Sequence, residues 1–360
     1  MKYSVTFKKR MEGSSGNILV IRIFAIIAAI VATAALLLIL GYSPAKIARV
    51  LQGIFISTFF SRYGIMDTLT KTIPLLLCAV AVSYAFRMKM WNIGAEGQLA
   101  IGAFAANAVA LAFPDMPAVP LILLMIAAGM LAGAVWALLA ALPRALMGVS
   151  ETIMTLMLNY VALMLLQFMI LCVWKDPAGK GFPIAPPISR NAWFPVIPGT
   201  YIHMGLLIGL IMTGVYAFVI GRTKWGFEVR TIGESPSAAR YAGMNLTLNM
   251  LLVLGVSGAV AGLAGVSELA GIAHRLEMDI SAGYGFTAVI IAWLARLNPL
   301  GVVVMSVFMA ALLVGGGYVQ ILGIPYAVAT LIQGIILFFV LGFDALTRYE
   351  IRIVRKEAAR

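Results

Sequence analysis

The stretch PLILLMIAAGMLAGAVWALLAAL, residues 120–142, decides the class of fold, because it is apolar throughout and contains no charged residue. About 20 such residues form a helix long enough to span the hydrocarbon core of a bilayer. Outward from this stretch, similar runs recur at about 18–40, 73–88, 97–113, 153–174, 203–221, 249–269, 285–297, 300–321 and 325–343. We therefore predict an all-α polytopic membrane protein, with about ten transmembrane helices in a domain covering residues 18–343.

Composition supports this class and excludes others. The chain is 62% hydrophobic and 11% charged, whereas a soluble domain carries about 25% charged residues. The net charge of +12 does not indicate a nucleic-acid partner, since the basic residues lie at the ends of the apolar runs, where they orient membrane helices. Cys78 and Cys172 lie inside such runs, and no spacing typical of a metal site or disulfide framework is present. We predict no metal and no cofactor.

Basic residues also predict the orientation of the chain. Most of the 26 Lys and Arg residues fall on one side if both termini are cytoplasmic. This arrangement requires an even number of spans, with cytoplasmic tails at 1–17 and 344–360. The first apolar run, 18–40, is too long for the core of a cleavable signal peptide and is expected to remain as a spanning helix.

Two segments on the predicted external side have distinct characters. Residues 175–202 contain six prolines, which rule out a regular helix, so we expect an ordered cap there, with Trp193 and Phe194 near the membrane interface. Residues 44–62 are amphipathic and are typical of a helix lying on the membrane surface.

The longest polar segment on the internal side reads GRTKWGFEVRTIGESPSAARYAGMN, residues 221–245. Ser235 is a favoured N-cap, Pro236 suits the first helical position, and Gly243 suits the end of a helix. We predict a short cytoplasmic helix of about two turns. Its alternative is a plain connecting loop.

Residues 88–98 separate two short apolar runs and favour a discontinuous membrane helix. Gly94 and Gly97 weaken a helix, while Asn92 and Glu96 are unsuited to lipid. Short, glycine-interrupted segments are typical of helices that line a substrate pathway. Two interpretations of 91–98 stay open: a segment at the translocation path, or a cytoplasmic turn in which Glu96 caps the next helix.

Polar residues within the predicted spans add further candidates. Asn159 and Gln167 are expected on about the same face of the fifth span, where they contact either the solute or a neighbouring helix. Glu268, near the external end of the seventh span, has a functional role by default, since ionisable side chains are costly in a membrane.

Several motifs resemble one family of transport proteins. The sequence WNIGAEGQ, residues 91–98, is similar to the motif of the nucleoside-type branch of the sugar and branched-chain amino acid permeases of ATP-binding-cassette importers, with Trp91 where Phe is expected. The sequences SETIM (150–154) with LNY (158–160), and GYGF (283–286) with LNPLG (297–301), are similar to further blocks of this branch. The internal segment resembles the coupling loop of such permeases, with Ala238, Ala239 and Gly243 at matching places.

This resemblance implies the permease subunit of an importer in the bacterial inner (plasma) membrane, carrying a small polar solute such as a nucleoside or simple sugar by alternating access. The implied partners are an ATPase subunit, a second permease that is more often different than identical, and a periplasmic or lipoprotein solute-binding protein. The substrate pathway would include Asn92, Gly94, Glu96, Gln98 and Asn159. The residues coupling the permease to the ATPase would be Ser235, Ala238, Ala239, Arg240 and Gly243.

The chain itself is not expected to be an enzyme. It contains no G-x-x-x-x-G-K-[ST] loop that would bind ATP phosphates, and no zinc-protease or nucleophile-elbow motif. A self-powered secondary transporter or channel is the alternative. It would need coupling ions, yet the spans hold few carboxylates beyond Glu96 and Glu268, and it leaves the short internal helix unexplained.

Overall fold

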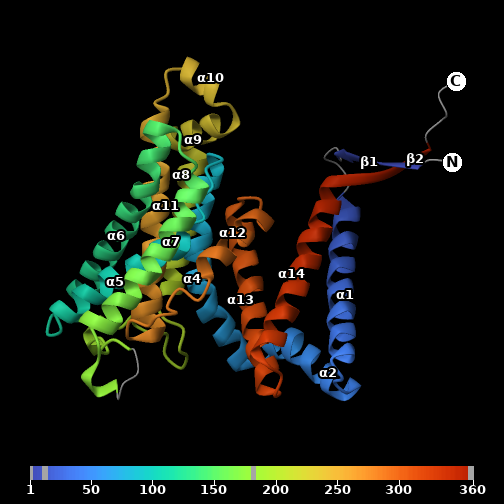
Figure 1. Ribbon diagram of the computed structural model, residues 1–360, viewed down its shortest axis with the longest axis horizontal. Coiled ribbons are helices and arrows are strands. Elements are labelled where there is room, and N and C mark those ends of the chain that lie inside the picture. The colour runs from blue at the N-terminus through green and yellow to red at the C-terminus, as the bar shows by residue number, and fades with distance from the viewer. Residues whose placement is uncertain (1–2, 10–14, 180–183, 356–360) are drawn as a thin grey trace. The chain divides into compact units, whose positions relative to one another are not determined.

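The computed structural model describes residues 3–9, 15–179 and 184–355, and most of them are helical (Figure 1). Residues 1–2, 10–14 and 356–360 of the predicted tails lie outside the described residues. The chain forms two compact units, one combining Met1–Ile65 with Ala311–Arg360 and the other consisting of Met66–Ala310. The predicted all-α polytopic class is confirmed.

The first unit joins the two ends of the chain. Helix α1 (Ser15–Ile39) packs along α14 (Tyr326–Arg348). Strands β1 (Tyr3–Lys9) and β2 (Tyr349–Arg355) pair as an antiparallel ribbon. The ribbon was not predicted for the two tails, because pairing between opposite ends of a chain has no local sequence signal.

The amphipathic stretch 44–62 is helical in the same unit. Helix α2 (Pro44–Gln52) continues into a π-helical turn, η1 (Gly53–Ser57), and a short helix, α3 (Thr58–Phe60). The side chain of Ser43 caps α2 by accepting a hydrogen bond from a backbone N–H of its first turn.

The second unit contains the remaining helices. They are α4 (Arg62–Arg87), α5 (Ala95–Ala112), α6 (Ala118–Met147), α7 (Glu151–Phe168), α8 (Gly205–Arg222), α9 (Lys224–Glu234), α10 (Pro236–Tyr241), α11 (Leu246–Glu268), α12 (Tyr284–Leu294) and α13 (Pro299–Ile321), of which α4 and α13 extend past its bounds. Helices α7 and α11 each end in a π-helical turn, η2 (Met169–Val173) and η5 (Leu269–Ala273). Short 3₁₀ turns, η3 (Pro177–Gly179) and η4 (Arg190–Ala192), follow α7.

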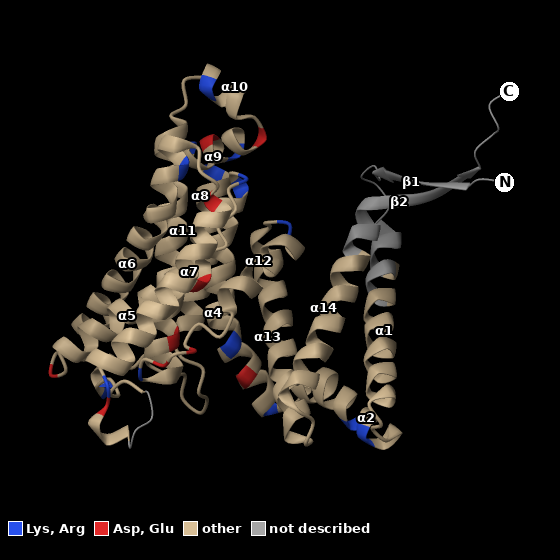
Figure 2. Ribbon diagram, viewed as in Figure 1, with Lys and Arg blue, Asp and Glu red and all other residues tan. Residues whose placement is uncertain are grey.

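Among the described residues, eight helices are long and apolar enough to cross a membrane, and two shorter apolar helices cover Phe24–Ile39 and Tyr284–Leu294. Each of the ten predicted segments coincides with one of these helices. Most charged residues of the second unit lie toward helix ends or in connections (Figure 2), as expected for helices that pass through hydrocarbon.

Helix α11 packs lengthwise against α5 and α6, and small residues allow this close approach. A Cβ added to Gly262 would overlap the backbone of Gly129 on α6, and one added to Gly265 would overlap the carbonyl of Leu99 on α5. Close helix contact through small residues is a common way for membrane helices to associate, because apolar side chains gain little by leaving lipid. These contacts make α5, α6 and α11 the packed centre of the unit.

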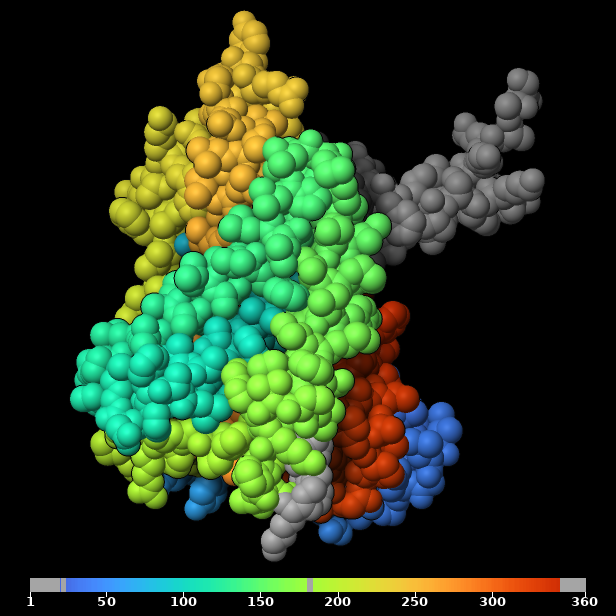
Figure 3. All heavy atoms as spheres, turned by 60° about the vertical axis from the view of Figure 1, so that its left-hand side comes forward, coloured from blue at the N-terminus to red at the C-terminus, as the bar shows by residue number. Residues whose placement is uncertain are grey.

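The internal polar segment folds into two helices rather than one. Helix α10 follows the prediction, since the Ser235 hydroxyl accepts a hydrogen bond from the Ala238 N–H (3.3 Å) and Gly243 has a positive φ of 78°. Helix α9 was not predicted. Its buried face includes Val229 and Ile232, but the glycines at 226 and 233 obscured this periodicity. Figure 3 shows the gold α10 region projecting beyond the rest of the unit.

The proline-rich segment is an ordered cap where it is described, which excludes 180–183. The Phe194 N–H donates to the Ala270 carbonyl (2.9 Å), and the Ile188 N–H donates to the His274 carbonyl (2.9 Å). The Trp193 ring stacks on the His274 ring, with centroids 3.8 Å apart. Phe194 is buried, so its ring packs inside the protein.

Candidate translocation site

A break in the helical path separates α4 from α5. Helix α4 ends at Arg87, Lys89 adopts a left-handed conformation with φ of 57°, and α5 begins at Ala95. The Asn92 amide donates to the Ser257 hydroxyl (2.8 Å). Ser257 lies about 16 Å along α11 from its first residue, at 1.5 Å per residue. The chain therefore turns back into the bundle, and α5 starts inside it.

The backbone of this break is held by buried amide side chains. Asn92 and Gln98 exchange hydrogen bonds of 3.0 and 3.1 Å, and the Gly94 N–H donates to the Asn92 side-chain oxygen (2.9 Å). A Cβ on Gly94 would come within 2.9 Å of the Thr155 side chain. Non-helical backbone is stable at membrane depth only when protein or water satisfies it, and here protein groups do so.

One face of α7 attaches to the same break. The Asn159 side chain accepts from the Gly97 N–H (2.9 Å) and donates to the Ile93 carbonyl (2.9 Å). One and two turns earlier on this face, Thr155 accepts from the Ile93 N–H (3.3 Å) and Glu151 from the Trp91 N–H (3.2 Å). Gln167, which the sequence placed on the face of Asn159, is exposed and takes no part.

Glu96 joins the break to α12. Its carboxylate lies in the first turn of α5, yet it accepts hydrogen bonds from the backbone N–H groups of Gly283 (2.9 Å) and Gly285 (2.7 Å). These groups belong to the N-terminal end of α12, where a negative charge is favourable. Glu96 therefore caps α12 as well as occupying the start of its own helix.

The C-terminal end of α12 is bonded by Arg87, the last residue of α4 before the break. The Arg87 guanidinium donates to the Leu297 carbonyl (2.6 Å), and the Tyr216 hydroxyl donates to the same oxygen (3.0 Å). A positive charge suits the C-terminal end of a helix. Arg87 and Glu96 thus hold the two ends of α12 like a clamp, and we call this arrangement the α12 clamp.

The structure brings together all five residues predicted for the pathway: Asn92, Gly94, Glu96, Gln98 and Asn159. All five are buried and bonded to protein groups. Sequence reasoning missed Ser257, Thr155 and the glycines of α12, because no short motif signals contacts between segments so far apart in the chain. Within the described residues, no group of three or more His, Cys, Asp or Glu side chains could hold a metal ion.

The predicted coupling residues lie on and beside α10 and differ in their exposure to solvent. Ala238, Arg240 and Gly243 are exposed, Ser235 is partly exposed, and Ala239 is fully buried. The Met244 N–H donates to the Ala239 carbonyl (3.0 Å). Tyr241, which sequence reasoning did not single out for a role, has 97% of its surface exposed.

A bundle of apolar helices around a buried non-helical break defines the class of protein as a polytopic membrane protein of the transporter type. Residues 64–341 match the family described as branched-chain amino acid transport system / permease component. This match covers most of the chain, which therefore belongs to that family.

Individual relatives are similar over nearly the whole chain. The glucose ABC transporter permease protein TsgB13 of Haloferax volcanii is 35% identical over 83% of this chain and 81% of its own length. The guanosine ABC transporter permease protein NupP of Bacillus subtilis is 32% identical over 95% of this chain and 98% of its own length. The nucleoside ABC transporter permease protein NupB of Lactococcus lactis is 30% identical over 85% of this chain and 86% of its own length.

Proposed function

We propose that this chain is the permease subunit of an ATP-binding-cassette importer for nucleosides or simple sugars. The observation that carries the proposal is the match of residues 64–341 to the permease family, joined by the near full-length similarity to NupP. The chain is a multi-pass membrane protein, and we propose the bacterial inner membrane as its location. ATP hydrolysis is proposed to occur on a separate subunit.

Helix α10 is proposed as the docking site for that ATPase. It projects from the unit (Figure 3) and exposes Ala238, Arg240 and Tyr241. Ala239 faces inward and anchors α10 to its neighbours. A short helix with one exposed and one anchored face can transmit a push from a partner to the helices behind it. Nucleotide-driven closure of the ATPases would then alternate the access of the solute path.

The break between α4 and α5 is proposed to lie at this path. Asn92, Gly94, Gln98 and Asn159 would give the non-helical backbone a defined shape, and Glu96 would transmit movements of the break to α12. We further propose an external solute-binding protein, as membership of the permease family implies. We also propose a second permease subunit, which we expect to be a different chain rather than an identical copy.

Co-purification tests the docking proposal. We expect the native complex to contain a P-loop ATPase that is lost in Tyr241→Ala and Ala238→Glu. Tyr160→Ala, which removes an exposed tyrosine from α7, is the matched control and should keep the ATPase. Ala239→Glu would bury a charge and disturb α10 itself, so it is unsuited to this test. Retention of the ATPase by both α10 variants would refute this docking site.

Uptake into cells producing the complete complex tests the solute class. We expect ATP-dependent accumulation of guanosine or glucose, and none of leucine. Accumulation of leucine instead would refute the solute class. Uptake that continues without ATP but stops when the ion gradient is collapsed would refute the importer and favour a secondary transporter.

A further inference from the structure

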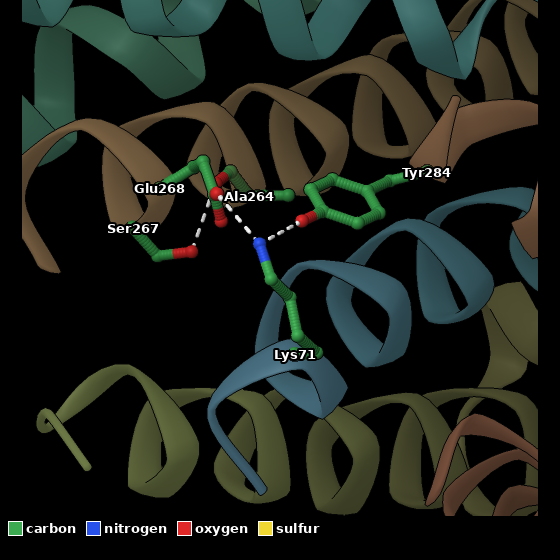
Figure 4. A network of polar contacts seen from close by, with 5 residues as sticks. All are labelled: Lys71, Ala264, Ser267, Glu268 and Tyr284. Atoms are coloured by element: carbon green, nitrogen blue, oxygen red, sulfur yellow. Dashed lines mark hydrogen bonds and ion pairs between the residues drawn. The ribbon is translucent and has the colours of Figure 1, made fainter. Parts of the chain in front are cut away.

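A second polar cluster lies in the same unit, away from the break between α4 and α5. Lys71 of α4, Glu268 of α11 and Tyr284 of α12 converge there (Figure 4). Lys71 is in the first half of α4, whereas α9 packs against the other end of α4, with Gly233 close to Arg87. The cluster is therefore near the end of the unit opposite the proposed docking helix.

The three side chains form a compact arrangement of partners. The Lys71 Nζ atom lies 3.8 Å from Glu268 Oε1 and donates a hydrogen bond to the Tyr284 hydroxyl (2.7 Å). The Glu268 side chain is 8% exposed, while that of Lys71 is 39% exposed. The cluster is thus closed on the side of the carboxylate and open on the side of the ammonium group.

Each charged group of this cluster keeps hydrogen-bonding capacity that the other two side chains do not use. An ammonium group has three N–H donors, and the Tyr284 hydroxyl accepts from one of those of Lys71 (2.7 Å). The Glu268 carboxylate, at 3.8 Å, is an ion-pair partner beyond hydrogen-bond distance. Glu268 Oε2 is buried and has no hydrogen-bond partner. The cluster therefore combines unused donors on its exposed side, at Lys71, with an unused acceptor on its buried side, at Glu268. A hydroxyl group, which both donates and accepts, matches this pair better than a group that can do only one.

A purely structural ion pair does not account for these features. Glu96 shows what a structural carboxylate looks like in this protein, because both of its oxygens accept backbone N–H groups. A buried carboxylate oxygen without a hydrogen bond lowers the stability of the folded protein, and an apolar residue at position 268 would avoid this penalty. In addition, a half-exposed ammonium group on a membrane helix must face water or protein rather than lipid.

We propose that Lys71 and Glu268 bind a hydroxyl group of the transported solute, a ribose or hexose hydroxyl, with Tyr284 positioning the ammonium group. This inference rests on the proposed function as a permease. The opposite charges of Lys71 and Glu268 leave the site without net charge, which favours an uncharged polyhydroxyl solute over a phosphate ester. Lys71 and Glu268 select the solute at this end of the bundle, before it reaches the break.

The test pairs protein variants with deoxy solutes in cells producing the complete complex. Initial rates are measured for guanosine and its 2′-, 3′- and 5′-deoxy analogues, and for glucose and 2-deoxyglucose, with the native chain, Glu268→Gln and Lys71→Gln. We expect kcat/KM for the carried solute to fall about 10- to 100-fold in both variants, the effect of losing a hydrogen bond to a charged group. For one deoxy analogue, the native preference for the hydroxyl should disappear in the variants.

Asp279→Asn is the matched control, since Asp279 is exposed in the segment between η5 and α12, and it should retain native rates. Co-purification of the ATPase verifies that each variant assembles, and the double variant Lys71→Gln/Glu268→Gln, which leaves no unpaired charge, provides a second assembled form. Deoxy preferences that are unchanged in assembled variants would refute the hydroxyl site while leaving the importer intact. A native complex that carries neither guanosine nor glucose would refute the solute class first and the ligand of this site with it.

Discussion

Replacing Glu96 with alanine should loosen α12, and the structure gives the size of the effect. The substitution removes two hydrogen bonds from backbone N–H groups to a buried carboxylate. Each such bond contributes about 1.5–3 kcal/mol, which makes about 3–6 kcal/mol for the pair. Since removing a buried charge relieves part of its desolvation cost, we expect the lower end, about 3 kcal/mol. That free energy corresponds to roughly a 150-fold increase in the open population of the α12 end.

Amide hydrogen exchange followed by mass spectrometry measures this opening directly. In the assembled complex, peptides covering residues 283–287 should lose about two orders of magnitude of protection in Glu96→Ala. Uptake should also fall, because α12 and the break between α4 and α5 would no longer be joined. Glu234→Ala is the matched control. The Glu234 side chain is 84% exposed and its pair with Lys89 spans 3.6 Å, so its loss should change stability by at most about 1 kcal/mol.

Equal protection of 283–287 in the two variants would show that the carboxylate does not hold α12. Unchanged uptake by Glu96→Ala in an assembled complex would separately refute a role for the 91–98 segment at the path. The two readouts therefore test the α12 clamp and its part in transport independently.

Three further predictions concern packing, the break and pH. Gly262→Ala should lower the unfolding temperature by an amount equivalent to about 1–3 kcal/mol, because its Cβ would overlap the Gly129 backbone. Gly255→Ala on the same helix should be neutral or slightly stabilising, because its Cβ would lie 3.7 Å from the nearest atom, in the Leu138 side chain. Asn159→Leu leaves the Gly97 N–H and the Ile93 carbonyl without their hydrogen-bond partner, and should destabilise the protein by about 2–4 kcal/mol with loss of uptake. Gln167→Leu on the same helix should behave as the native chain. Burial lowers the pKa of His203, which precedes α8, to about 4 from about 6.5. The unfolded chain therefore binds the proton more readily, and thermal unfolding measured against pH should show stability falling between about pH 6.5 and 4, by up to about 3 kcal/mol, with a smaller slope in His203→Gln. A flat stability profile over that range in the native protein would contradict the third prediction.

The spanning helices were predictable from sequence because their signal is local. The length of an apolar run can be counted directly in the sequence, and the thickness of the bilayer sets the length that a spanning helix requires. The caps of α10 were equally local, since Ser235, Pro236 and Gly243 act on the backbone within a few residues of themselves. Helix α9 was not predicted although it is amphipathic, because two of the four residues on its buried face are glycines, which weaken the apolar periodicity.

The partners of the break were beyond sequence reasoning for a physical reason. Gly94 and Gly97 indicated that the helix is interrupted, but the sequence left open whether 91–98 lies at the translocation path or forms a cytoplasmic turn. The hydroxyl of Ser257 and the N–H groups of Gly283 and Gly285, however, are 165 or more residues away from the groups they bond. Such contacts depend on the packing of all the intervening helices, and a single sequence does not report that packing.

The α12 clamp also constrains how this protein can change over generations. Arg87 and Glu96 lie on the two sides of the break between α4 and α5, and each bonds one end of α12, a helix of 11 residues. One residue inserted into the break would move Glu96 relative to Arg87. One residue inserted into α12 would shift one end of the helix by about 1.5 Å and rotate it by about 100° relative to the other end. We therefore expect insertions and deletions between Arg87 and Glu96, and within α12, to be rare among relatives, because each would displace one of the two contacts.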